Sequence, residues 1–155
     1  MRNEVSLQKY RGQVTLVVNV ASQCGYTDLN YRELVELQDE FSREGFTVLA
    51  FPCNQFGEQE PGSMAEITEF TRSYGINFPL FSKVDVSGRD ASAVYSFLHE
   101  STRTLPQWNF GKYLVGQKWG REAILFGEGR FFRHSPGRQI LAGQTTHGTI
   151  TRQPL

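Results

Sequence analysis

The pattern of apolar and polar positions is clearest in the first third of the chain. An apolar, β-branched run at residues 14–20 leaves no polar face, which is typical of a strand buried on both sides. Residues 28–43 repeat apolar side chains at helical spacing, and Asp28 is the expected N-cap. A second apolar run, residues 46–51, ends at Pro52, which cannot donate a hydrogen bond within a sheet. This order predicts two parallel strands joined by a right-handed helical crossover.

Three shorter elements are predicted farther along the chain. Residues 63–66 have the capping-box pattern, and an apolar stripe behind them predicts a helix that ends near Ser73. A further helix is expected over residues 91–99, and residues 113–115 offer a short strand. The pattern as a whole indicates an α/β protein.

The periodic pattern fades after Val115. Glycines recur through the rest of the chain and interrupt every candidate element, so no helix is predicted there. We therefore divide the chain into a domain of residues 5–115 and an atypical segment of residues 116–155. We expect that segment to be mobile and to lower the stability of the protein.

Composition and charge limit the classes of partner. The 155 residues are 39% apolar and 13% aromatic, which suits one compact domain. Lys+Arg and Asp+Glu each number 16, so no net charge favours nucleic acid or an anionic membrane. No apolar run approaches the ~20 residues of a membrane helix. The first residues lack the apolar segment of a secretory signal, so these residues alone predict a cytoplasmic protein.

Two cysteines are too few for a disulfide framework, and scattered histidines do not predict a metal site. Cys24 lies between a predicted strand end and a predicted helix start, where a thiolate is stabilised and can be reached. Its spacing alone leaves an inert, buried thiol open as an alternative. A dithiol reductase is disfavoured because Cys24 lacks the second cysteine of a Cys-x-x-Cys motif.

Three stretches carry a resemblance to a known family. Residues 19–27 read NVASQCGYT, residues 51–61 read FPCNQFGEQEP and residues 108–110 read WNF. In this order they resemble the signatures of glutathione peroxidases, and the similarity extends over residues 5–115. The resemblance implies a thioredoxin-like fold, a central mixed sheet flanked by helices, whose closing C-terminal strand and helix are missing or altered. The chain is most similar to the monomeric cysteine members of the endoplasmic reticulum, which implies a monomer and the lumen as a second candidate compartment.

The resemblance also implies the site residues. Carried over position by position, the catalytic tetrad consists of Cys24, Gln59, Trp108 and Asn109. An indole N–H and two amide groups are neutral donors that can stabilise a thiolate and the oxygen leaving a peroxide. The implied reaction is attack of the Cys24 thiolate on a peroxide oxygen, which gives a sulfenic acid and releases water or an alcohol. Without the resemblance, Trp108 would be interpreted as a core aromatic and Gln59 as a loop residue.

Regeneration of the sulfenic acid requires a thiol. Many cysteine members carry a resolving cysteine in the second helix, but this chain has none there, so Cys53 is the remaining candidate, with a structural thiol as the alternative. The implied reductant is glutathione or a protein dithiol such as protein disulfide isomerase or thioredoxin, and no cofactor is implied. The alternative function is a catalytically weak variant that binds redox partners because its altered C-terminus prevents the site from closing.

Overall fold

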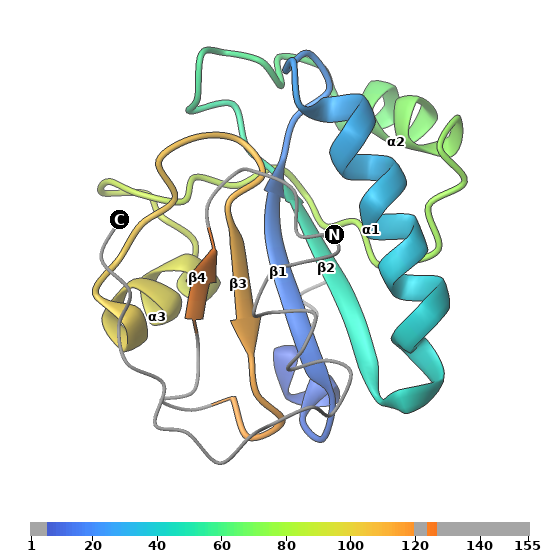
Figure 1. Ribbon diagram of the computed structural model, residues 1–155. Helices are drawn as coiled ribbons and strands as arrows, with labels where there is room; N and C mark the ends of the chain where they lie inside the picture. The colour runs from blue at the N-terminus through green and yellow to red at the C-terminus, as the bar shows by residue number, and fades with distance from the viewer. Residues whose placement is uncertain (1–5, 120–123, 127–155) are drawn as a thin grey trace.

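A mixed four-stranded sheet forms the centre of the protein (Figure 1). The computed structural model describes residues 6–119 and 124–126. Its strands are β1 (Val14–Val20), β2 (Phe46–Pro52), β3 (Lys112–Val115) and β4 (Ile124–Phe126), in the order β2-β1-β3-β4. β1 pairs in parallel with β2 and antiparallel with β3, which pairs antiparallel with β4. The predicted parallel pair is therefore confirmed.

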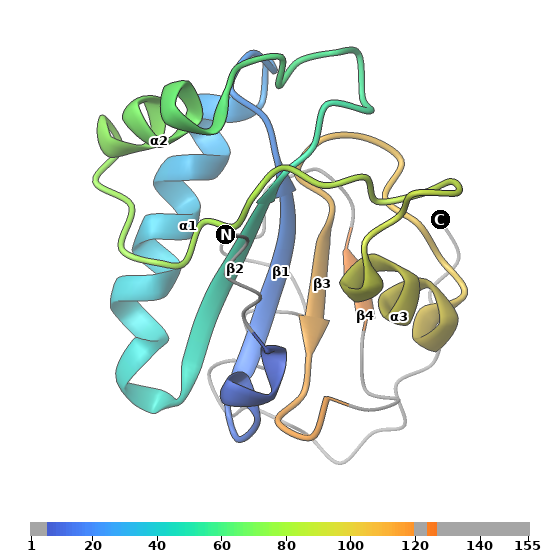
Figure 2. The same ribbon diagram turned by 180° about the vertical axis from the view of Figure 1, so that it is seen from behind.

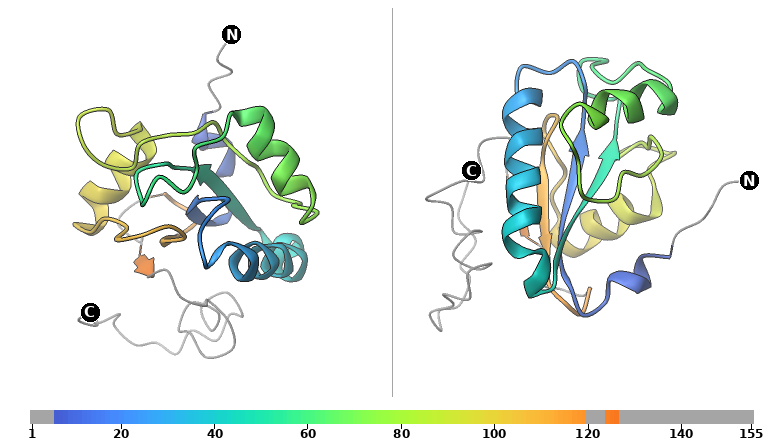
Figure 3. Two further views of the ribbon diagram at one scale, coloured as in Figure 1. Left: turned by 90° about the horizontal axis from the view of Figure 1, so that it is seen from above. Right: turned by 90° about the vertical axis from the view of Figure 1, so that its right-hand side faces the viewer.

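Helices cover both faces of the sheet. α1 (Thr27–Phe41) lies on one face, whereas α3 (Ala93–Thr102) and the short helix η1 (Leu7–Tyr10) lie on the other (Figures 2 and 3). α2 (Met64–Arg72) lies beside the beginning of α1, and η2 (Ser42–Glu44) directly follows the end of α1.

Two apolar clusters, one on each face, form the core. Side chains alternate between the faces of a strand, so neighbouring β1 residues belong to different clusters. The cluster on the α1 face includes Leu16, Val18 and Val20, and the cluster on the α3 face includes Val17. Burial on both faces explains why the run at residues 14–20 lacks a polar side.

The predicted helices exist, but the boundaries of two of them differ. α1 begins at Thr27, and its N-cap is Tyr26, which makes no side-chain cap bond. The prediction that Asp28 is the N-cap was therefore wrong. Asp28 lies instead in the first turn, where its charge suits the positive end of the helix. α3 begins at Ala93 because Ser92 caps it by accepting a hydrogen bond from the backbone N–H of Tyr95.

The segment after Val115 contributes one strand that the apolar pattern did not predict. β4 has only three residues, too few to establish a period-two alternation. It extends the sheet beyond β3 by antiparallel pairing. Residues 116–155 are predicted to be mobile, and most of them lie outside the described part of the chain.

The capping box of α2 is present. Ser63 Oγ accepts a hydrogen bond from the Glu66 backbone N–H at 3.2 Å, and the Glu66 carboxylate accepts one from the Ser63 backbone N–H at 2.7 Å. We expect Ser63→Ala to lower the free energy of unfolding by about 1 kcal/mol, because it leaves a backbone donor without its cap. Urea unfolding tests this. Ser82→Ala, at an exposed loop serine, is the control and should leave stability unchanged.

Candidate active site

Three loops meet at one edge of the sheet (Figure 1). The first follows β1 and carries Cys24, the second follows β2 and carries Gln59, and the third precedes β3 and carries Trp108 and Asn109. The parallel strands β1 and β2 end at this edge, and the antiparallel strand β3 begins there. Residues far apart in the chain are therefore brought together by the pairing of the strands.

Cys24 is half-buried at the beginning of α1. Its backbone N–H donates to Thr27 Oγ1 at 3.0 Å, and that hydroxyl donates to the Ala21 carbonyl oxygen at 2.8 Å. The Tyr26 backbone N–H donates to Cys24 Sγ at 3.4 Å. The sulfur therefore receives a backbone donor near the positive end of a helix, which favours a negative charge on it.

Backbone hydrogen bonds join the first loop to the second. The Gln23 N–H donates to the Gln59 carbonyl oxygen at 3.0 Å, and the Cys53 N–H donates to the Val20 carbonyl oxygen at 3.1 Å. Strand-like pairing thus continues beyond the ends of β1 and β2. It fixes the backbone next to Cys24 against the backbone of Gln59.

Asn19 attaches the third loop to β1. Its fully buried side chain donates from Nδ2 to the Trp108 carbonyl oxygen at 2.9 Å, and the backbone carbonyl oxygen of Asn19 accepts from the Phe110 N–H at 2.7 Å. Gly111 permits this approach, because a Cβ atom there would lie 3.1 Å from Asn19 Oδ1 and 2.8 Å from Pro106 Cβ. No role for Asn19 was predicted from the sequence. The sequence feature that could have indicated a role is its amide side chain, which lies in a strand made mostly of apolar residues.

The side chains of Gln59 and Asn109 are in direct contact. Asn109 Nδ2 donates to Gln59 Oε1 at 2.9 Å and to the Phe56 carbonyl oxygen at 3.2 Å. This bond turns the oxygen of Gln59 toward Asn109, and the NH₂ group is the part of the amide that can donate a hydrogen bond to the site. Asn109 is fully buried and therefore orients Gln59 in this arrangement.

The indole ring of Trp108 packs on the loop that carries Gln59. Its centroid lies 6.1 Å from that of Phe56 in an edge-to-face arrangement. A Cβ atom on Gly57 would lie 2.9 Å from Trp108 Cη2 and 3.4 Å from Gln59 Cδ, so both side chains contact the same glycine. Among the described residues, Trp108 Nε1 has no hydrogen-bond partner, so this donor is available to the site.

We expect Gly57→Ala to slow oxidation of Cys24 by roughly 10- to 10²-fold, because the new methyl group would displace Trp108. Gly57 has a φ of +67°, so alanine also adds roughly 1–2 kcal/mol of backbone strain. Gly88→Ala is the matched control, since Gly88 has a φ of +88° but nothing within 4 Å of its Cβ position. Stopped-flow oxidation and urea unfolding separate the two effects. Equal oxidation rates in both variants would contradict the steric argument.

Cys53 lies apart from this group. It is fully buried in the apolar cluster on the α3 face, whereas Cys24 packs against the cluster on the α1 face. Burial raises the pKa of the Cys53 thiol, which donates to Gln55 Oε1 at 3.6 Å. Both cysteines are free. The structure therefore brings Gln59, Trp108 and Asn109 together beside the Cys24 loop but places Cys53 on the opposite face of the sheet.

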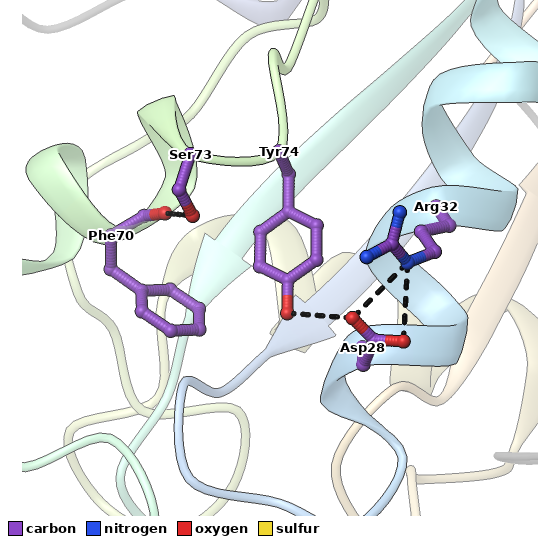
Figure 4. A network of polar contacts seen from close by, with 5 residues as sticks. All are labelled: Asp28, Arg32, Phe70, Ser73 and Tyr74. Carbon is purple, nitrogen blue, oxygen red and sulfur yellow. Dashed lines mark hydrogen bonds and ion pairs between the residues drawn. The ribbon is translucent and has the colours of Figure 1, made fainter.

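A network of polar contacts supports the beginning of α1 (Figure 4). Asp28 accepts hydrogen bonds from Arg32 Nε at 3.1 Å and from the Tyr74 hydroxyl at 3.2 Å. The ring of Tyr74 stacks on that of Tyr31, with centroids 5.1 Å apart. These contacts join the segment after α2 to the helical turn that follows Cys24. The ion pair is exposed, so its contribution to stability is small.

The described residues contain no group of three or more His, Cys, Asp or Glu side chains able to hold a metal ion. Within the same ranges, no helix combines the length and the apolar character needed to cross a bilayer.

Comparison with solved structures agrees with the predicted thioredoxin-like fold. The crystal structure of Trgpx in apo form superposes with a TM-score of 0.65 at 33% identity, over 88% of this chain and 82% of that one. The solution structure of a thioredoxin-like protein in the oxidised form has a TM-score of 0.64 at 16% identity, over 92% of this chain and 88% of that one. At that identity the second likeness concerns the fold alone.

Comparison of sequences identifies the family. The glutathione peroxidase family model matches residues 1–99, which include Cys24 and Gln59 but not Trp108 or Asn109. "Probable glutathione peroxidase 8-B" of Xenopus laevis is 57% identical, and glutathione peroxidase 7 of Bos taurus is 55% identical, each over 112 residues or 72% of this chain. The chain spans 54% and 60% of the lengths of these two relatives. With its fold and these similarities, the chain belongs to the glutathione peroxidase family.

Proposed function

We propose that this chain is a thiol-dependent peroxidase that reduces hydrogen peroxide or organic hydroperoxides through Cys24. The observation that carries the proposal is the hydrogen bond from Asn109 to Gln59 Oε1 beside the Cys24 loop. This bond orients Gln59 with its NH₂ group as a donor. The Trp108 indole N–H, which has no partner among the described residues, is a second donor at the sheet edge where the half-buried Cys24 lies. Neutral donors held in place stabilise negative charge as it develops on sulfur and on oxygen.

In the proposed first step, the Cys24 thiolate attacks one peroxide oxygen. An S–O bond forms while the O–O bond breaks, and the sulfur becomes a sulfenic acid. The departing hydroxide or alkoxide takes up a proton and leaves as water or an alcohol. Gln59 and Trp108 would donate hydrogen bonds to this oxygen as its charge develops.

We propose that an external thiol, glutathione or a protein dithiol, reduces the sulfenic acid. Cys24 and Cys53 pack on opposite faces of the sheet, so a disulfide between them would require both loops to move. Attack of the external thiol on the Cys24 sulfur releases water and forms a mixed disulfide, which a second thiol then resolves. The resemblance to monomeric members of the endoplasmic reticulum supports a monomer in that lumen as part of this proposal.

Stopped-flow mixing of the reduced chain with hydrogen peroxide tests both steps. We expect rapid loss of the Cys24 thiol, with mass spectrometry finding a trapped sulfenic acid at Cys24 and an intact thiol at Cys53. A Cys24–Cys53 disulfide as the first stable product would contradict reduction by an external thiol. If peroxide leaves Cys24 unchanged, the chain is the catalytically weak, partner-binding variant instead.

A further inference from the structure

A buried carboxyl group lies directly behind the Cys24 loop. Glu60 follows Gln59 in the second loop, and only 1% of its surface is exposed. Its Oε1 accepts hydrogen bonds from the backbone N–H of Ser22 at 3.1 Å and from Ser22 Oγ at 2.5 Å. Ser22 precedes Cys24 by two residues. The carboxyl group therefore holds the backbone that leads to the nucleophile.

Glu60 is itself held in place by its main chain. Its backbone N–H donates to Asn54 Oδ1 at 2.9 Å, and the preceding residue, Gln59, accepts the backbone hydrogen bond from Gln23. Gln59 thus bonds to the first loop through its backbone, and the next residue, Glu60, bonds to it through its side chain. Removing the Glu60 carboxylate would leave the Gln23 bond alone to align Cys24 with Gln59.

We infer that Glu60 is a positioning residue for Cys24, and that its ionised carboxylate sets the distance between the Cys24 sulfur and the donors on Gln59 and Trp108. The inference rests on the proposed peroxidase function. Hydrogen bonds to a charged acceptor are shorter and stronger than neutral ones, which suits the 2.5 Å bond from Ser22 Oγ, whereas the bond from the Ser22 backbone N–H has an ordinary length of 3.1 Å. The second oxygen, Oε2, is buried without a hydrogen-bond partner in the described part of the chain. A buried charge with an unpaired oxygen lowers the stability of the fold, so stability does not explain the presence of this carboxylate.

Burial raises the pKa of Glu60, while the bonds from Ser22 and the charge of Lys83 oppose this increase. Two other titratable groups interact with this carboxyl. Burial raises the pKa values of Tyr31 and Cys53, and the charge of Glu60 adds to both increases. A carboxyl whose pKa is raised by folding stabilises the protein where it is protonated, and this contribution is lost as pH rises through the raised value.

Glu60→Gln keeps the size of the side chain and an oxygen acceptor but removes the charge. We expect oxidation of Cys24 by hydrogen peroxide to slow about five- to tenfold at neutral pH, because two charge-assisted bonds become neutral ones. Glu58→Gln makes the same chemical change at an exposed side chain of the same loop and should leave the rate unchanged.

The pH dependence distinguishes positioning from simple packing. As pH rises from 4.5, the ordinary value for Glu, the ratio of the wild-type rate to the Glu60→Gln rate should increase. Over the same range, the stability of the variant relative to wild type should also increase, because only the wild type buries a growing charge. Taking the ratio of the two rates removes any dependence on pH that both proteins share. A ratio that is constant with pH would overturn the inference.

Two further measurements keep the test decisive. Ser22→Ala removes only the hydroxyl bond and should slow the reaction about two- to fivefold, with a reduced effect when Glu60→Gln is already present. Purely additive effects would mean that the two residues act separately. Alkylation of Cys24 by iodoacetamide, which requires no peroxidase activity, should slow in the same direction in Glu60→Gln. If the wild type fails to react with peroxide but alkylation still differs, the proposed function fails while the positioning role stands.

Discussion

Replacement of Cys24 by serine should abolish peroxide reduction, with a loss of at least about 10³-fold in turnover. Serine is nearly the same size, so the loop and the start of α1 should keep their structure. Its hydroxyl, however, is a far weaker nucleophile than a thiolate near neutral pH. A coupled assay with glutathione or a protein dithiol measures turnover, and circular dichroism verifies the fold.

Cys53→Ser is the matched variant, because it makes the same chemical change at a cysteine on the opposite face of the sheet. The first oxidation of Cys24 should proceed at the wild-type rate in this variant. Cys53 is fully buried, so some stability is expected to be lost when a hydroxyl replaces its thiol. Equal loss of the first oxidation step in both variants would reverse the assignment of the nucleophile.

Trp108→Phe should slow the oxidation of Cys24 about 10²-fold. Phenylalanine keeps an aromatic ring against Phe56 but removes the indole N–H, and the loss of one donor from a preorganised site commonly has an effect of this size. The measurement is the second-order rate constant for Cys24 oxidation under single-turnover conditions, where the reductant plays no part.

Trp119→Phe provides the control for this variant. Trp119 stacks on Phe97 with ring centroids 6.1 Å apart and packs against the cluster on the α3 face, away from Cys24. The Trp119→Phe variant loses an indole donor as well, but Cys24 in this variant should be oxidised by peroxide at the wild-type rate. An unchanged rate in Trp108→Phe would mean that Trp108 serves only in packing.

Local patterns identified most of the described elements because their causes are local. The run that forms β1 is apolar on both faces, and the capping box of α2 lies within four consecutive residues. The N-cap of α1 was misplaced by two residues, at Asp28 instead of Tyr26, because no side chain caps this helix. β4 was missed because three residues carry too little periodicity, and its existence depends on pairing with β3.

The candidate site, too, could be predicted only in part from the sequence. The residues at the sheet edge could be named from the sequence through the resemblance, and the place of Cys24 between a strand and a helix agrees with that assignment. The sequence could not tell that Asn109 occupies the oxygen of Gln59, or that Asn19 anchors the Trp108 loop to β1. Those contacts join residues 50 and 89 positions apart, and no local preference specifies them.

The sequence by itself determined the α/β class and the main strands and helices, because these depend on side-chain type and short-range periodicity. It pointed to Cys24 as the candidate nucleophile through the resemblance of its motifs to a known family. Only the tertiary structure decided the relations between the two cysteines and between Glu60 and Ser22. Successive residues of a strand point to opposite faces of a sheet, so Cys53 is separated from Cys24 although both follow neighbouring parallel strands. Burial likewise distinguishes Glu60 from Glu58, the exposed carboxylate of the same loop. A polar group enclosed by protein must bond to the donors that the fold places beside it, and for Glu60 these are the backbone N–H and the hydroxyl of Ser22.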